Sequence, residues 1–270
     1  MCGVFGLILP SGTDAEVPAR ALLTLGTLAE ERGIDAAGLA FWTGRKGRTP
    51  GNVATIAGQP AAVVDGWQIR KRLGRFRDLP CRELAAEMRS AKVVLGHTRY
   101  AVQGDPFRLD NAGPLTVGQF VGAYSGDCDA ADLRRQYRQR QTVGDTDGAA
   151  VLQALSDGAD IPAVLEVLGT LRGKAAMAWA DRERPERVWL ARVACTPLAV
   201  AYTAGGAALW ASDPEWLRHA AFSWGIELTG NGPQMLPEGT LLALDAGTRV
   251  RPASQWTFTP ASAGALEVAA

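Results

Sequence analysis

The sequence predicts an α+β fold in which stacked β-sheets are covered by helices on the outside. Short apolar segments bounded by turn residues recur in two blocks, which is the pattern of strands in a sheet. Segments with apolar residues at helical spacing separate these blocks and flank them. With 270 residues and 47% hydrophobic residues, the chain can bury a sizeable core. No internal repeat and no interdomain linker interrupts this pattern, so layered sheets are expected.

The first block contains three expected strands. Residues 3–9, 36–42 and 92–100 are apolar segments, and the last of them ends in a polar turn that contains His97 and Arg99. Residues 17–32 are predicted to form an amphipathic helix that ends at Gly33. Residues 43–61 are expected to form an exposed excursion or hairpin. The basic stretch 67–77 is interpreted as the solvated face of a helix, which continues at 82–90.

The second block follows a strand at 120–124 and three helices. These helices are expected at 129–140, 148–155 and 161–171, and a further one at 214–222. Short turn-bounded strands are predicted at 174–180, 188–193, 198–202, 207–212 and 240–244. Residues 252–270 lose apolar periodicity, so the predicted organisation is one domain over 1–251 and a loose tail over 252–270.

Composition excludes several classes of function. Lysine plus arginine equal aspartate plus glutamate at 28 each, which argues against nucleic acid or an anionic membrane as the partner. The N-terminus does not resemble a signal peptide and no apolar run is long enough to span a bilayer, so a cytoplasmic protein is expected. The four cysteines are scattered without CxxC spacing, and there are two histidines. Neither a metal site nor a disulfide framework is therefore predicted.

The second residue, Cys2, is the first candidate for chemistry. If Met1 is removed, Cys2 carries a thiol and a free α-amine on the same carbon, and the amine can act as a general base near neutral pH. The alternative is an ordinary buried cysteine that happens to follow the initiator methionine. The first nine residues alone do not distinguish these two interpretations.

Further segments, taken together, resemble the class II (N-terminal nucleophile, Ntn) glutamine amidotransferase domain, as in glucosamine-6-phosphate synthase and amidophosphoribosyltransferase. The matching pieces occur in the order of the family and cover roughly residues 2–245. They are CGVFG at 2–6, RGIDAAGLA at 32–40, GHTRYA at 96–101, NAGP at 111–114, SGD at 125–127, GDTDG at 144–148, LRGKAAMAW at 171–179 and LWASD at 209–213. Each piece alone is a weak signal, whereas the ordered series is specific.

The resemblance implies a four-layer αββα Ntn-hydrolase sandwich that hydrolyses glutamine to glutamate and ammonia, without a cofactor. Cys2 is expected to be the nucleophile, and Arg32 to pack beside it and order it. Arg99 is expected to bind the α-carboxylate of glutamine through a bidentate fork, and Asp145 its α-ammonium group. Gly126 is expected to donate its backbone N–H to the substrate and to the oxyanion hole.

The chain departs from the family pattern at two places in the site. Tyr124-Ser125-Gly126 replaces His-Asn-Gly, so the oxyanion-hole amide of the asparagine is lost and Ser125 becomes the candidate for its role. Val102-Gln103 replaces a Thr-His pair, which removes a polar contact and leaves Gln103 as a further candidate substrate-binding residue. Three explanations stay open: glutamine hydrolysis with a re-formed hole, action on a different amide, or loss of catalysis.

Because the matching motifs occupy nearly the whole chain, they imply a stand-alone glutaminase subunit. Its partners would be glutamine and an ammonia-accepting synthase on a separate chain. The alternatives are an Ntn amidase acting on another γ-glutamyl or small amide, and a catalytically weakened regulatory or interaction module. The sequence does not decide whether the chain forms a homo-oligomer. His97 is expected to be a structural hydrogen-bonding residue behind the site.

Overall fold

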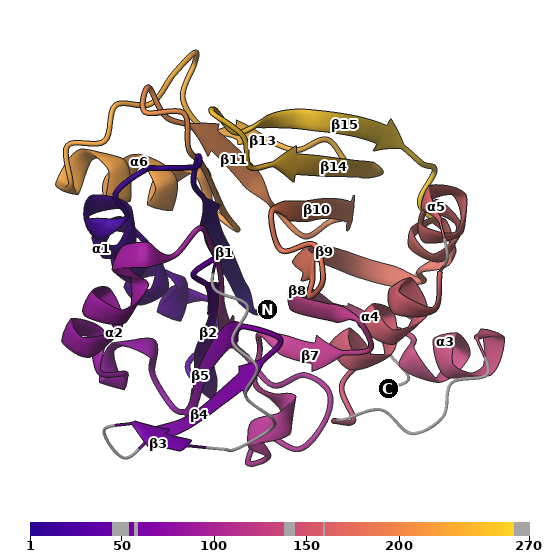
Figure 1. Ribbon diagram of the computed structural model, residues 1–270. Coiled ribbons are helices and arrows are strands. Elements are labelled where there is room, and N and C mark those ends of the chain that lie inside the picture. Colours follow the sequence, from indigo (N-terminus) through magenta and orange to yellow (C-terminus); the bar gives the residue numbers. More distant parts are fainter. Residues whose placement is uncertain (45–53, 57–58, 138–143, 159, 262–270) are drawn as a thin grey trace.

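Two antiparallel β-sheets lie face to face, and helices cover the outer face of each sheet (Figure 1). The computed structural model describes residues 1–44, 54–56, 59–137, 144–158 and 160–261. Helices α1 (Glu16–Leu28), α2 (Cys81–Glu87) and α6 (Pro214–Ser223) flank one sheet; α3 (Ala130–Gln136), α4 (Asp147–Asp157) and α5 (Ile161–Thr170) flank the other. The predicted four-layer αββα sandwich is confirmed.

The larger sheet has nine strands and carries the N-terminus at its centre. Its order is β13-β11-β12-β1-β6-β2-β5-β4-β3. The central strand β1 is buried along its whole length, which explains why its sequence is continuously apolar rather than alternating. The strands are β1 (Gly3–Ile8), β2 (Ala36–Trp42), β3 (Ala54–Ile56), β4 (Gln59–Val64), β5 (Trp67–Leu73), β6 (Val93–Arg99), β11 (Ala199–Tyr202), β12 (Ala208–Ala211) and β13 (Gln234–Met235).

The smaller sheet has six strands in the order β15-β14-β10-β9-β8-β7. Strand β8 contributes the segment Tyr124-Ser125-Gly126 and pairs with β9 along its whole length. The strands are β7 (Leu115–Val117), β8 (Phe120–Cys128), β9 (Gly173–Asp181), β10 (Arg187–Ala194), β14 (Thr240–Asp245) and β15 (Arg251–Thr257).

Three clusters of buried apolar side chains fill the spaces between the four layers of helices and sheets. In β1, alternate side chains enter two different clusters. Phe5 and Leu7 pack toward α1, whereas Val4 and Ile8 pack between the two sheets. Gly6 is required here because a Cβ atom at this position would lie 2.2 Å from the indole of Trp210. The third cluster lies between the smaller sheet and helices α3 to α5. Burial of the apolar side chains in these three clusters is the main contribution to the stability of the fold.

The prediction of a helix over 67–77 is wrong, because strand β5 occupies Trp67–Leu73. Trp67 and Ile69 alternate with more polar residues and face the space between the sheets, which is a period of two rather than 3.6. Arg70 is buried, and its guanidinium contacts Glu87 of α2 at 2.7 Å. The basic composition of this segment therefore led to the wrong prediction of a helix. The segment is a strand, and one of its arginines forms an ion pair with a helix packed on the sheet.

The predicted loose tail is also wrong over its first part, because β15 pairs with β14. This edge strand is almost entirely exposed, so its side chains do not need to alternate between apolar and polar. Backbone hydrogen bonds to β14 hold it in the sheet. The ring of Trp256 packs 5.8 Å from that of Trp189 on β10. The rest of the expected tail, 262–270, lies outside the described residues, as do 45–53 and 57–58 of the expected excursion and 138–140 of the expected helix. Within the described part of the chain, no helix is long and apolar enough to cross a membrane.

Candidate functional site

The thiol of Cys2 lies where the N-terminal end of β1 meets the C-terminal end of β6. The backbone N–H of Tyr100 donates to Cys2 Sγ at 3.4 Å, and the thiol donates to the Tyr100 carbonyl at 3.5 Å. Burial raises the pKa of the Cys2 thiol above its ordinary value, and the backbone contact with Tyr100 partly opposes this rise. A thiolate at this position therefore requires a nearby base.

The backbone carbonyl of Cys2 is fixed by two side chains. Arg32 donates from Nε at 2.9 Å, and the hydroxyl of Ser125 donates at 2.8 Å. Arg32 follows the short 3-10 turn Ala29–Glu31 after α1, whereas Ser125 belongs to β8 of the opposite sheet. The nucleophile candidate is thus held by the segment after α1 on one side and by the smaller sheet on the other. The hydroxyl hydrogen of Ser125 is directed at this carbonyl.

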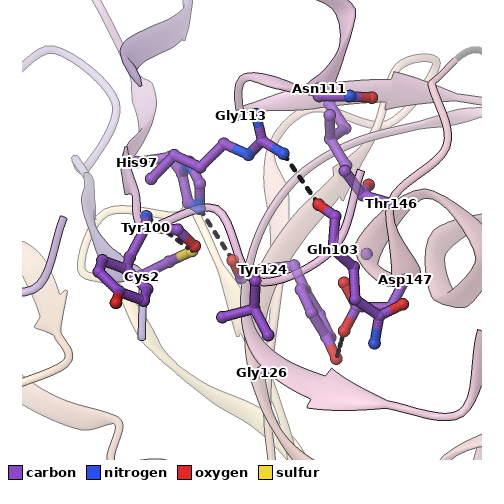
Figure 2. A pocket seen from close by; sticks show the side chains of 14 residues that line it. Cys2, His97, Tyr100, Gln103, Asn111, Gly113, Tyr124, Gly126, Thr146 and Asp147 are labelled. Carbon is purple, nitrogen blue, oxygen red and sulfur yellow. Dashed lines mark hydrogen bonds between the residues drawn. The ribbon is translucent and has the colours of Figure 1, made fainter. Parts of the chain in front are cut away.

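A pocket opens beside Cys2 and extends between β6, β8 and the N-terminus of α4. Figure 2 shows Cys2 and Tyr100 on one side of it, with Tyr124 and Asp147 paired on the other. The free space at its centre is about 30 Å³, room for one or two water molecules. Its lining includes Cys2, His97, Arg99, Tyr100, Val102, Gln103, Asn111, Gly113, Leu115, Tyr124, Gly126, Thr146, Asp147 and Gly148.

Arg99 is buried, and its guanidinium organises the loop that follows β6. It donates to the backbone carbonyls of Gln103 at 2.9 Å, Gly104 at 3.1 Å and Asp105 at 3.1 Å. The side-chain amide of Gln103 in turn donates to Asp127 at 2.9 Å and to the carbonyl of Cys128 at 2.9 Å. Together these bonds attach the loop to the end of β8.

Asp145 lies beside the pocket rather than in its lining. Its carboxylate accepts from the side-chain amide nitrogen of Asn111 at 2.6 Å, and its backbone N–H donates to the side-chain oxygen (Oδ1) of Asn111 at 3.1 Å. The Asp145 side chain is otherwise exposed. Asn111 does line the pocket, so this reciprocal pair fixes a carboxylate at the pocket edge.

The side chain of Tyr124 folds over Gly126 and closes one wall of the pocket. A Cβ atom at Gly126 would lie 2.4 Å from the Tyr124 hydroxyl oxygen and 2.4 Å from the backbone carbonyl oxygen of Lys174; because the backbone oxygen cannot move away easily, glycine is needed there. The Tyr124 hydroxyl donates to Asp147 at 2.9 Å, and the backbone N–H of Cys128 donates to the same carboxylate oxygen at 3.1 Å. Burial nevertheless raises the pKa of Asp147.

His97 lines the back of the pocket and is buried. Its Nε2 is 2.9 Å from the Tyr124 carbonyl, which can only accept, so Nε2 is the protonated nitrogen. Burial lowers the pKa of His97 to about 4. A neutral ring that joins β6 to β8 fits the predicted structural role. In the described part of the chain, no group of three or more His, Cys, Asp or Glu side chains could hold a metal ion.

Comparison with known proteins found relatives of similar sequence and solved structures of similar fold. No protein-family model matches the chain. It is 30% identical to glutamine–fructose-6-phosphate aminotransferase (isomerizing) of Bacillus licheniformis over 202 residues, 71% of this chain and 29% of that protein. The enzyme of the same name from Bacillus subtilis strain 168 is 29% identical over 202 residues, with the same coverage.

Solved structures extend the likeness to almost the whole chain. Glutamine phosphoribosylpyrophosphate amidotransferase from B. subtilis, complexed with ADP and GMP, superposes with a TM-score of 0.63 over 94% of this chain and 49% of that one, at 19% identity. A structure described as the allosteric regulatory enzyme of purine biosynthesis gives a TM-score of 0.64 at 20% identity, with the same coverage. The chain is a class II glutamine amidotransferase domain. It spans less than a third of the length of the curated relatives that it matches.

The structure brings most of the predicted residues of this amidotransferase domain together. Cys2, Arg99, Gln103 and Gly126 line one pocket. Arg32 and Ser125 contact the Cys2 carbonyl from outside the lining. Asp145 stands next to the pocket through Asn111. The catalytic and binding roles of these residues stay predictions.

Sequence reasoning gave no role to Asn111 or Tyr124. Asn111 is the first residue of the matching segment NAGP, and that match was its only signal. Tyr124 was noted only as a replacement, and nothing in the sequence indicated that its hydroxyl reaches Asp147. Contacts between residues 23 positions apart depend on how β8 packs against α4, which no local pattern encodes.

Proposed function

We propose that this amidotransferase domain hydrolyses the side-chain amide of glutamine, with Cys2 as the nucleophile once Met1 is removed. The ammonia would pass to a synthase on a separate chain. The observation that carries the proposal is the position of Cys2: its thiol faces a pocket shared with Arg99, Gln103 and Gly126, while its carbonyl is fixed by Arg32 and Ser125. A nucleophile held in this way is preorganised for attack.

In the proposed reaction, the α-amine of processed Cys2 takes the thiol proton. The thiolate attacks the amide carbon, and the amine then returns the proton to the leaving nitrogen, which departs as ammonia. Water hydrolyses the resulting thioester and releases glutamate. The raised thiol pKa in the Met1-bearing chain makes this base necessary, because without it little thiolate forms at neutral pH.

Arg99 and Asp145 are the proposed partners of the two charged groups of the amino acid. Three carbonyls hold Arg99 in place, so its positive charge is fixed before the substrate arrives. Asp145 is held by Asn111, and its exposed carboxylate can accept from an ammonium group. One fixed cation and one fixed anion are complementary to a zwitterion.

The proposed oxyanion hole relies on the backbone N–H of Gly126. Since the Ser125 hydroxyl is directed at the Cys2 carbonyl, it is not assigned to the oxyanion. One missing donor costs on the order of 10²–10³ in rate, so we expect slow turnover of glutamine by the isolated chain.

Action on a different amide is the second candidate. Tyr124 fills the space above Gly126, and the centre of the pocket offers about 30 Å³. These two observations favour a small amide that is shorter than glutamine; a γ-glutamyl compound would need the same space for its glutamyl chain as glutamine does. A small pocket would also be compatible with a module that has weak catalysis and acts by binding another protein.

Release of glutamate and ammonia from glutamine tests the proposal. The full chain, shown by intact mass to lack Met1, is incubated with glutamine, asparagine and a γ-glutamyl anilide in parallel. Cys2→Ala is the matched control. Turnover of glutamine that disappears in Cys2→Ala supports the first candidate. If the chain turns over only asparagine or the γ-glutamyl anilide, glutamine hydrolysis is refuted in favour of action on a different amide. If it turns over none of the three amides, both candidates are refuted.

A further inference from the structure

Helices α1, α2 and α6 cover the face of the larger sheet that points away from the smaller sheet (Figure 1). A second concavity is lined by residues of α1 and α2 and by Trp224, which follows α6. We name it the α1–α2 groove. Its volume of about 540 Å³ far exceeds that of the space beside Cys2, and none of its lining residues lines the Cys2 pocket. It is lined by Glu16, Arg20, Leu23, Thr24 and Thr27 from α1, by Cys81, Arg82, Ala85, Ala86 and Arg89 from α2 and the turn after it, and by Trp224.

The α1–α2 groove is positively charged in a chain that is neutral overall. Three arginines and one glutamate line it. Arg20 pairs with Glu16 at 3.3 Å. Arg82 and Arg89 are exposed, and among the described residues neither has an ion pair or a side-chain hydrogen bond. Two cations, Arg82 on α2 and Arg89 in the turn after it, are therefore available to an external anion.

The same groove presents apolar surface between its arginines. Leu23, Ala85 and Ala86 line it, and small side chains permit close approach of another helix. Trp224 also lines the groove, and its indole nitrogen donates a hydrogen bond to the Thr24 hydroxyl at 2.9 Å, which fixes the ring in place.

We propose that the α1–α2 groove binds an acidic amphipathic helix of a partner protein. An apolar strip flanked by unpaired arginines is complementary to a helix with aliphatic residues on one face and carboxylates beside them. Trp224, which lines the groove, would anchor such a helix, as aromatic side chains do in interfaces. The inference does not depend on amide hydrolysis.

The C-terminal segment of this chain is not the proposed occupant. Ala261, the last described residue, donates to the Gly169 carbonyl of α5 at 2.8 Å. Helix α5 belongs to the outer layer on the far side of both sheets (Figure 1). Ala261 therefore lies on the opposite face of the sandwich from the α1–α2 groove.

Fluorescence anisotropy with a designed peptide tests the proposal. The probe is a labelled, end-capped helix of about 18 residues, with leucine and alanine on one face and glutamate on the flanks. The control peptide carries glutamine at every glutamate position. The protein is the full chain, as wild type, as the double variant Arg82→Glu/Arg89→Glu, and as Arg184→Glu. Arg184 is also an exposed arginine but lies after β9, outside the α1–α2 groove.

We expect the acidic peptide to bind the wild type at least about tenfold more tightly than the glutamine peptide, with an affinity that falls as salt is added. The double variant should bind it about tenfold more weakly, whereas Arg184→Glu should not change the affinity. Thermal unfolding of each variant verifies that it is folded. Equal affinity for both peptides, no binding, or an unaffected double variant would each overturn the proposal. Self-association that the double variant abolishes would overturn it in favour of a second copy.

Discussion

Replacing Ser125 with alanine separates two roles that this residue could have. If its hydroxyl positions the nucleophile through the Cys2 carbonyl, as the 2.8 Å bond indicates, the loss is that of one neutral hydrogen bond, about 1 kcal/mol. Arg32 still holds the same carbonyl at 2.9 Å, which limits the displacement. Because about 1.4 kcal/mol corresponds to tenfold, kcat should fall less than about tenfold. An oxyanion donor would instead cost about 10²–10³.

The assay combines urea unfolding with the rate of ammonia release from the substrate that the wild type turns over. Ser212→Ala is the matched control, since the Ser212 hydroxyl is also buried against β1, where it accepts from the Val4 N–H at 3.0 Å but does not line the pocket. Both variants should lose about 1 kcal/mol of unfolding free energy. A hundredfold loss of kcat in Ser125→Ala with unchanged stability would refute the reasoning.

Three further predictions concern the surroundings of the site. Asn111→Ala removes both bonds to Asp145 and should raise KM about tenfold with little change in kcat; an unchanged KM in steady-state kinetics would contradict the assignment. Burial lowers the pKa of His97 to about 4 in the folded state, against an ordinary value of 6.5, so the unfolded chain binds a proton there more readily than the folded chain. The contribution of neutral His97 to the free energy of unfolding is therefore fully present above pH 6.5 and is lost as pH falls toward 4. This loss amounts to roughly 3 kcal/mol, and urea unfolding of His97→Gln across this range should show a correspondingly flatter pH dependence. Tyr124→Phe should lower the unfolding free energy by about 1–3 kcal/mol, because Asp147 loses a buried donor; a melting temperature equal to that of the wild type would count against it.

The sequence predicted the fold well where apolar periodicity was strong. The central strand β1, the helices of both outer layers and most strands of the last third were found because buried faces leave regular patterns. The prediction failed at β5, where Arg70, Lys71 and Arg72 suggested a solvated helix. The stabilising partner of Arg70 is Glu87 on a helix packed over the sheet, a tertiary contact that local sequence does not reveal.

The candidate site was predictable as a set of residues but not as a geometry. Motif order identified Cys2, Arg99 and Asp145. It did not show that Arg99 binds three carbonyls of its own loop or that Ser125 faces the Cys2 carbonyl. These arrangements depend on the distance between the two sheets and on the path of the loop after β6. Both are set by the packing of the whole core.

Covalent labelling of Cys2 tests the central claim most directly. The purified chain is treated with a glutamine analogue that carries an electrophilic carbon in place of the amide, and is analysed by intact mass and peptide mapping. We expect Met1 to be absent, one analogue to be added to Cys2, and Cys81, Cys128 and Cys195 to remain unmodified. Retention of Met1, or labelling of another cysteine in place of Cys2, would contradict it.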